Sequence, residues 1–66
     1  IYRINNYTLY DYYGGEICEI PRDKNVMYLD EDCFKNNTTV KKVILPSTLT
    51  EIPENAFQGC INLEYV

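Results

Sequence analysis

The strongest constraint on the fold of this chain is an internal repeat. Residues 26–43 and residues 49–66 align when one is shifted by 23 residues, the separation of Phe34 and Phe57, and their main apolar positions then coincide. The aligned pairs are Val26 with Leu49, Leu29 with Ile52, Phe34 with Phe57, Val40 with Leu63, and Val43 with Val66. A period in the low twenties with this apolar spacing is typical of a solenoid, in which stacked coils share one core. Solenoid proteins are usually binding surfaces rather than catalysts.

Within each repeat the sequence predicts a first strand, a proline turn, a second extended piece, and a helical or 3-10 turn. The two extended pieces and the helical turn lie at 17–21, 26–29 and 30–36 in the first repeat and at 42–46, 49–52 and 53–59 in the second. Both first strands end at a proline, which cannot donate to a β-ladder. Asp30 or Pro53 stands at the start of each helical turn, acidic residues follow in its first turn, and Asn36 or Gly59 closes it, as at helix ends. The loop after Pro21 is longer than the loop after Pro46, and we place an insertion there.

Residues 1–16 do not fit the repeat. Their four tyrosines after position 6 precede a Gly-Gly pair, which favours a turn. Ile4, Tyr7 and Leu9 are expected to supply a short strand. A terminal coil would otherwise expose its apolar face, so we interpret residues 1–16 as an N-terminal cap. Residues 17–66 then contain two repeats and the start of a third strand.

The alignment also predicts a buried core. Phe34 and Phe57 share one column and should stack against each other. The expected core residues are Leu29, Phe34, Val43, Leu45, Ile52, Phe57 and Leu63. Cys33 lies in the column of a small alanine and Cys60 in the column just after the turn, so we expect both thiols to be buried and unpaired. With no C-x-x-C pair and no histidine, the chain is not expected to bind zinc or another metal.

Composition excludes several classes of function. The net charge is −4, and the six basic residues are scattered, so no basic patch is available for nucleic acid. No apolar run approaches the roughly 20 residues that a membrane-spanning helix needs. Without histidine, neither a Ser-His nor a Cys-His nucleophile can form, and no glycine-rich phosphate loop is present. We therefore expect neither an enzyme nor a cofactor-binding protein.

The outward side of the first strands is the candidate partner-binding face. Because side chains alternate along a strand, Lys42 and Ile44 should point outward from the second repeat. The same alignment places Ile17 and Glu19 on the outside of the first strand and Tyr65 on the outside of the third. Stacked strands should then present Ile17, Lys42 and Tyr65 in one column, with Glu19 beside Ile44. Exposed isoleucine and tyrosine side chains together indicate an interaction site.

Residues 45–66 follow the pattern L-P-x-x-[LV]-x-x-I-x-x-x-A-F-x-x-C-x-x-L-x-x-[VI] throughout. They resemble the BspA-like leucine-rich repeat family, also called the Treponema pallidum type. Residues 20–43 are a degenerate copy, in which Cys33 replaces the usual alanine and Asn37 the usual cysteine. The resemblance implies a leucine-rich repeat solenoid of mostly β structure with α+β character. It also implies a secreted or surface-exposed protein that adheres to host proteins, other cells or polysaccharide-bearing structures, and it carries no set of catalytic residues.

We therefore expect a protein-binding module from an extracellular or cell-surface, bacterial leucine-rich repeat protein that acts in adhesion or partner recognition. The alternative is a small acidic inhibitor or phage-type effector, cytoplasmic, that blocks an enzyme by protein contact or by mimicking nucleic acid. The partner is another protein, or a second copy that pairs with the open strand at 63–66. Because the chain does not begin with methionine, we expect a piece or a processed product of a longer protein.

Overall fold

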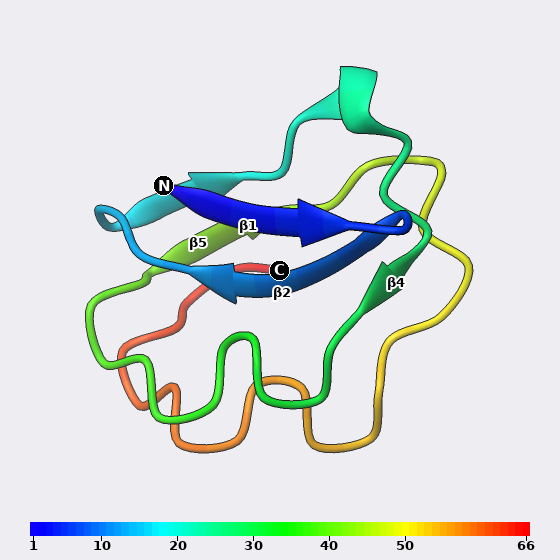
Figure 1. The fold of residues 1–66 in the computed structure, drawn as a ribbon. Coiled ribbons are helices and arrows are strands. Elements are labelled where there is room, and N and C mark those ends of the chain that lie inside the picture. Colours follow the sequence, from blue (N-terminus) through cyan, green and yellow to red (C-terminus); the bar gives the residue numbers. More distant parts are fainter.

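A computed structural model describes all residues of the chain, 1–66. The chain forms five short strands and one 3-10 helix: β1 (Tyr2–Asn5), β2 (Thr8–Tyr12), β3 (Ile17–Glu19), η1 (Arg22–Lys24), β4 (Tyr28–Leu29) and β5 (Lys42–Ile44). The strands make two small sheets with the orders β1-β2-β4 and β3-β5. The turns that follow β4 and those that precede the C-terminus lie together at the bottom of Figure 1, away from the sheets. No helix is long and apolar enough to cross a membrane.

The first parallel ladder joins segments that are far apart in the sequence. The opposed pairs of β3 and β5 are Ile17 with Lys42, Cys18 with Val43 and Glu19 with Ile44. A parallel bridge then joins Lys42 to Tyr65, and the Val43 N–H donates to the Tyr65 carbonyl at 3.0 Å. We call β3, β5 and the segment at Tyr65 the Tyr65 ladder.

A second parallel ladder runs beside the first. β2 and β4 pair with Thr8 opposite Tyr28 and Leu9 opposite Leu29. The Thr50 N–H donates to the Met27 carbonyl at 2.9 Å, so the second repeat continues this side of the molecule. We call these three segments the Leu9 ladder.

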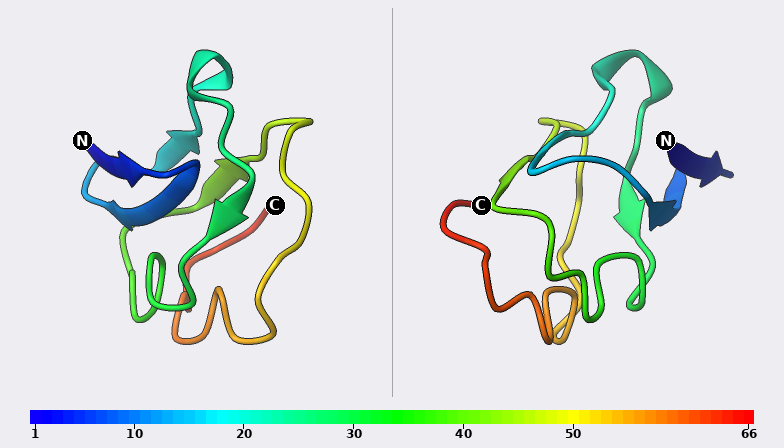
Figure 2. Two further views of the ribbon diagram at one scale, coloured as in Figure 1. Left: turned by 45° about the vertical axis from the view of Figure 1, so that its right-hand side comes forward. Right: turned by 90° about the vertical axis from the view of Figure 1, so that its left-hand side faces the viewer.

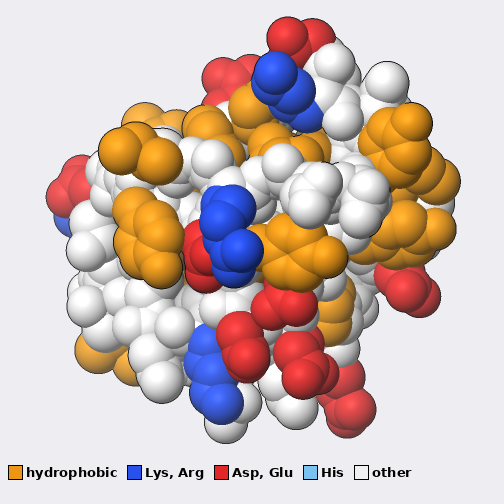
Figure 3. Space-filling view, viewed as in Figure 1, with side chains coloured by type: hydrophobic (Ala, Val, Ile, Leu, Met, Phe, Trp, Pro, Cys, Tyr) orange, Lys and Arg blue, Asp and Glu red, His pale blue; other side chains and the backbone are white.

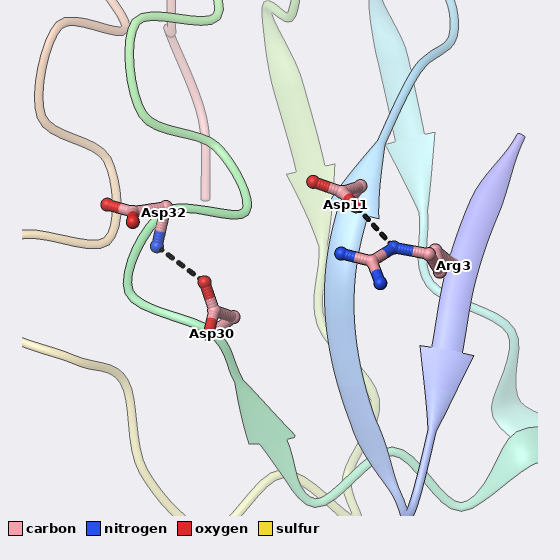
Figure 4. A network of polar contacts seen from close by, with 4 residues as sticks. All are labelled: Arg3, Asp11, Asp30 and Asp32. Atoms are coloured by element: carbon pink, nitrogen blue, oxygen red, sulfur yellow. Dashed lines mark hydrogen bonds and ion pairs between the residues drawn. The ribbon is translucent and has the colours of Figure 1, made fainter.

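β1 and β2 form an antiparallel hairpin at one end of the molecule, opposite the C-terminal segment in the right-hand view of Figure 2. Asn6 and Tyr7 make the turn, with φ values of 50° and 62°. Two consecutive positive φ values match the two-residue turns that suit the twist of a hairpin. Tyr7 therefore lies in a turn and not in a strand, contrary to the expectation from sequence. The hairpin is further held by an ion pair on its outer side, Arg3 Nε to Asp11 Oδ2 at 2.5 Å (Figure 4).

A row of four aromatic rings runs through the centre of the molecule, called here the aromatic stack; its Phe34–Phe57 pair is stacked and its other two pairs are tilted. The ring centroids are 5.3 Å apart for Tyr2–Tyr12, 5.8 Å for Tyr12–Phe34 and 5.2 Å for Phe34–Phe57. Tyr12 thus occupies, in the hairpin layer, the place that phenylalanine takes in the two repeats. A Cβ atom added to Gly14 would lie 2.5 Å from the Tyr12 hydroxyl oxygen. Gly14 therefore leaves space for this ring, whereas a Cβ atom at Gly15 would meet no other atom within 4 Å.

Side chains of the second repeat also bond to the backbone of the first. The bonds are Thr48 Oγ1 to Val26 O (2.7 Å), Thr50 Oγ1 to Met27 O (3.0 Å), Cys60 Sγ to Phe34 O (2.9 Å) and Asn62 Nδ2 to Thr38 O (2.6 Å). In all four the donor belongs to the later repeat and the acceptor to the earlier one. These inter-repeat bonds fix the offset between the two layers.

The most deeply buried core residues belong to the first repeat, which lies as a middle layer between the β1–β2 hairpin and the second repeat. Leu29, Phe34 and Val43 are buried, and Phe34 has no exposed surface. Leu45, Phe57 and Leu63 are half-buried and pack against the same cluster. Ile52 is 48% exposed, so its assignment to the core was wrong. It lies in the outermost layer, where no later segment of these residues covers it.

The segments expected to be helical turns are series of separate turns. In residues 30–37 the N–H groups of Cys33, Lys35 and Asn37 bond to carbonyls three residues earlier. Ala56, Gln58 and Cys60 do the same in the second repeat. Because the bonds fall on alternate residues, consecutive bonds of the kind that define a 3-10 helix do not form. The 3-10 helix η1 lies instead in the insertion after Pro21.

Side-chain and backbone geometry explain how these turns open and close. The Asp30 carboxylate accepts the Asp32 N–H at 3.0 Å (Figure 4), a local bond that favours a turn. Asn36 and Gly59 occupy equivalent positions and have φ values of 61° and 80°. A Cβ atom on Gly59 would lie 2.1 Å from Asn36 Oδ1, so the two turns touch here.

Candidate functional site

The outer side of the Tyr65 ladder brings the sequence-selected residues together. Ile17, Lys42 and Tyr65 lie side by side on adjacent segments, and Glu19 lies beside Ile44. Ile17 and Tyr65 are 65% and 64% exposed, whereas Ile44 is half-buried. We call these five residues the ladder face.

Buried neighbours hold the ladder face in place. Cys18 and Val43 follow Ile17 and Lys42 in the chain, and both are almost completely buried. Since alternate side chains of a strand point to opposite sides, their burial directs Ile17 and Lys42 outward. The Lys42 N–H donates to the Glu16 carbonyl at 3.0 Å, and this bond secures the start of the ladder.

Lys42 is an unpaired charge between two apolar side chains. The ion pairs of the chain are Arg3–Asp11, Lys35–Asp32 and Lys41–Glu16. Lys42 takes part in none of them, although Lys41 pairs with Glu16 at 3.4 Å at the margin of the same face. The ladder face therefore combines exposed apolar surface with an ammonium group that is free to contact a partner.

The three thiols are placed as structural groups. All are free; Cys18 and Cys33 are buried, and Cys60 is half-buried, less than expected. Burial raises the pKa of Cys18 and of Cys33 to about 12. It also raises the pKa of Cys60. Because the thiolate is the reactive form, these residues are poor nucleophiles near neutral pH.

Asn37 and Cys60, which align just after the turns of the two repeats, both make hydrogen bonds to the backbone. Its Oδ1 accepts the N–H groups of Thr39 and Val40, both at 3.0 Å. Cys60, the equivalent residue, donates its thiol to the Phe34 carbonyl. The residue at this position of each repeat therefore bonds to backbone groups of the first repeat, Asn37 as an acceptor and Cys60 as a donor.

One group of acidic side chains lies away from the ladders. Figure 3 shows this group in the lower half of the view, on the side where the turns of Figure 1 lie, with other acidic side chains at the top and left margins. Glu31, Asp32 and Glu54, which belong to these turns, are all exposed. They are solvated and lie at the openings of turns. This arrangement offers no enclosed pair of carboxylates for acid–base chemistry.

Comparison with known proteins identifies a family. The model of the BspA-type leucine-rich repeat region, which holds six copies of the repeat, matches residues 1–66. This match confirms the resemblance seen in residues 45–66. No curated protein and no solved structure matches the chain significantly. Repeat families of this kind generally provide interaction surfaces and not catalytic centres.

Proposed function

Because this chain belongs to the family of BspA-type leucine-rich repeats, we propose that it is a protein-binding module of an extracellular or cell-surface protein. Its function is adhesion to, or recognition of, a partner protein. The observation that carries this proposal is the ladder face. There, Ile17 and Tyr65 are each about two-thirds exposed and flank the unpaired Lys42.

The proposal includes an architecture. The two repeats are successive coils of a leucine-rich repeat solenoid, and residues 1–16 cap its first coil. The inter-repeat hydrogen bonds and the continuous aromatic stack support the coils. The cap is supported by Tyr12, which extends the stack, and by β1, which is antiparallel where the other strand pairings are parallel.

The chemistry of the ladder face suits a protein partner. Tyrosine is enriched among residues that dominate binding energy, because its large ring buries apolar area while its hydroxyl finds a hydrogen bond. Covering Ile17 would remove an exposed aliphatic side chain from water, which is worth roughly 1.5–3 kcal/mol on full burial. Lys42 lies between them and selects a partner with an acidic or carbonyl group at that position.

Partner capture by matched variants tests this proposal. The chain is immobilised, partners are identified by cross-linking and mass spectrometry, and each affinity is measured for Ile17→Ser and Tyr65→Ser. Both variants should weaken binding at least about tenfold, as expected for central interface residues. Ile61→Ser is the control, because Ile61 is 78% exposed and lies outside the ladder face. Equal losses in the control and the ladder variants would contradict the proposal.

The same experiment separates the alternative from sequence, a small acidic inhibitor. An inhibitor that uses negative charge would bind through the exposed acids of the turns. Glu31→Gln and Glu54→Gln would then weaken binding, and Ile17→Ser would not. The outcome therefore assigns the partner to the ladder face or to the acidic turns.

Self-association is a further part of the proposal and concerns the 66-residue chain alone. Leu63 is half-buried, Val66 is 62% exposed, and the backbone of 63–66 pairs on one side with β5 and its flanks. An open strand edge beside apolar side chains is a template for a second chain. Sedimentation equilibrium at micromolar concentration should show a dimer; a monomer at all concentrations would contradict it.

A further inference from the structure

β1 is an edge strand with unpaired backbone groups. Ile1 and Tyr13 exchange two hydrogen bonds, of 2.7 Å and 2.9 Å, and Arg3 lies opposite Asp11. In an antiparallel pair, bonded and non-bonded positions alternate. The pairing shifts between Arg3 and Ile4, but the extra residue, Tyr10, belongs to β2, so the alternation continues along β1. Tyr2 and Ile4 therefore direct their N–H and C=O groups away from β2. β1 ends the strand order of its sheet, so no other strand occupies this side.

A groove of about 620 Å³ lies against this strand. It is lined by Tyr2, Ile4, Asn5, Asn6, Tyr7, Pro21 and Lys24. One wall is β1 with its turn, and the other is the loop that leads into η1, which projects from the body above β1 in Figure 1. The Tyr2 hydroxyl donates to the Glu19 carbonyl at 2.6 Å and fixes the position of that side chain.

The groove has one charged lining residue, Lys24. Lys24 is exposed and belongs to no ion pair. The other lining groups are aromatic, aliphatic or amide side chains. A segment that enters the groove therefore meets apolar surface, amide hydrogen-bonding groups and one positive charge.

We propose that the free edge of β1 binds an extended segment of another protein, which carries an acidic residue, as an added β-strand. The backbone of that segment bonds to the N–H and C=O groups of Tyr2 and Ile4. Its alternate side chains enter the groove on the side of Tyr2 and Ile4, and its carboxylate faces Lys24. Main-chain bonds give such pairing its affinity, and side-chain pockets give it specificity.

The β1 strand of a second copy fits this edge less well. β1 reads Y-R-I-N and contains no acid, so its pairing with the β1 of another copy would leave Lys24 without a counter-charge. An acidic partner segment supplies that counter-charge, and this difference decides between the two occupants.

The groove shares no lining residue with the ladder face, although Tyr2 bonds to the Glu19 carbonyl, so binding at each site is tested with its own variants. The probe is a nine-residue peptide, acetylated and amidated, in which valine and threonine alternate around one central glutamate. The peptide is titrated into the ¹⁵N-labelled 66-residue chain and followed by NMR. We expect saturable shifts of the Tyr2, Ile4 and Lys24 amides and slower solvent exchange of the Tyr2 and Ile4 N–H groups. Shifts confined to Ile17, Lys42 and Tyr65, or the absence of saturable binding, would overturn the proposal.

Matched controls test the backbone and charge contributions separately. A peptide that is N-methylated at the residues facing Tyr2 and Ile4 should not bind, and one with lysine in place of glutamate should bind more weakly. Lys24→Glu should weaken binding of the parent peptide about fivefold at low salt, whereas Lys42→Glu should leave it unchanged. Equal binding of the methylated and parent peptides would refute strand addition. An equal effect of Lys24→Glu and Lys42→Glu would refute the assignment of the site.

Discussion

The aromatic stack predicts unequal destabilisation by two substitutions that look equivalent in the sequence. Phe34 is fully buried between Tyr12 and Phe57, whereas Phe57 is half-buried and stacks on one side only. Truncation of a fully buried phenylalanine to alanine typically costs about 3–5 kcal/mol. A chain of this size has a total stability of roughly 3–10 kcal/mol, so Phe34→Ala should leave much of it unfolded.

Milder substitutions keep the comparison measurable. Phe34→Leu should lower the free energy of unfolding by about 1–2 kcal/mol more than Phe57→Leu does, because it removes two ring contacts instead of one and leaves a cavity on both sides. The double variant should show a coupling energy of about 0.5–1.5 kcal/mol between the two rings. Urea unfolding, followed by far-ultraviolet circular dichroism and by tyrosine fluorescence, gives the free energies of unfolding of the parent chain, the two single variants and the double variant.

Two results would refute the reasoning. If Phe57→Leu destabilised the chain as much as Phe34→Leu, Phe57 would not be the outer ring of the stack. If the coupling energy were zero, the 5.2 Å separation of the two rings would not reflect an energetic contact. Leu63→Ala is a useful control, because Leu63 is half-buried and belongs to none of the ring pairs.

Further predictions concern turns and thiols. Gly59→Ala should cost about 1–3 kcal/mol in urea unfolding, because its φ of 80° and the adjacent side chain both oppose a Cβ atom, whereas Gly15→Ala should be near neutral. Tyr7→Gly should raise the urea midpoint by the equivalent of about 1 kcal/mol, because φ is 62° at Tyr7 and glycine suits that position of the hairpin turn. Stability should fall as pH rises above 9, because the pKa values of Cys18 and Cys33 are raised from 9.0 to about 12 and the unfolded thiols ionise first; a pH series of unfolding curves, compared with Cys18→Ala, measures this. The same two thiols should react with a maleimide only slowly in the native chain and rapidly in urea; rapid native labelling would contradict their burial.

Repetition made part of this structure predictable from sequence. The offset between the repeats relates Ile17, Lys42 and Tyr65, and the period of two along a strand separates them from their buried neighbours. Both arguments need only local spacing, because the strands of the two repeats pair in register. The placement of the ladder face therefore follows from sequence, while its role as a binding face stays a prediction.

The N-terminal layer was harder to predict because its spacing differs. Leu29 and Phe34 are five residues apart, but Leu9 and Tyr12, which take the same places in the hairpin layer, are only three apart. The Asn6-Tyr7 turn also lacks the glycine that usually marks a two-residue hairpin turn. Residues 1–16 thus gave no repeat signal, although Tyr12 continues the ring stack.

Other differences between the sequence-based predictions and the structure arise from tertiary context. The exposure of Ile52 depends on whether another layer covers it, which its own repeat does not encode. The turns carry acids and closing residues typical of helices, but their bonds fall on alternate residues, a backbone detail that composition does not determine. The edge of β1 was not found from sequence because its free groups belong to the main chain.

The inter-repeat hydrogen bonds predict the order in which the parts of the chain unfold and fold. The first repeat offers four carbonyl groups that side chains of the second repeat satisfy, so its hydrogen bonds are complete only after the second has docked. The second can detach alone. This exposes those four acceptors to water, together with the Lys41 carbonyl and the N–H groups of Asn36 and Val43, but leaves the hairpin and its ring contact with Phe34 in place. Native-state hydrogen exchange should therefore show protection that rises from residues 49–66 toward Leu9 and Leu29, with opening that begins at the later repeat. A nascent chain emerging from its N-terminus would acquire its layers in the reverse of that order.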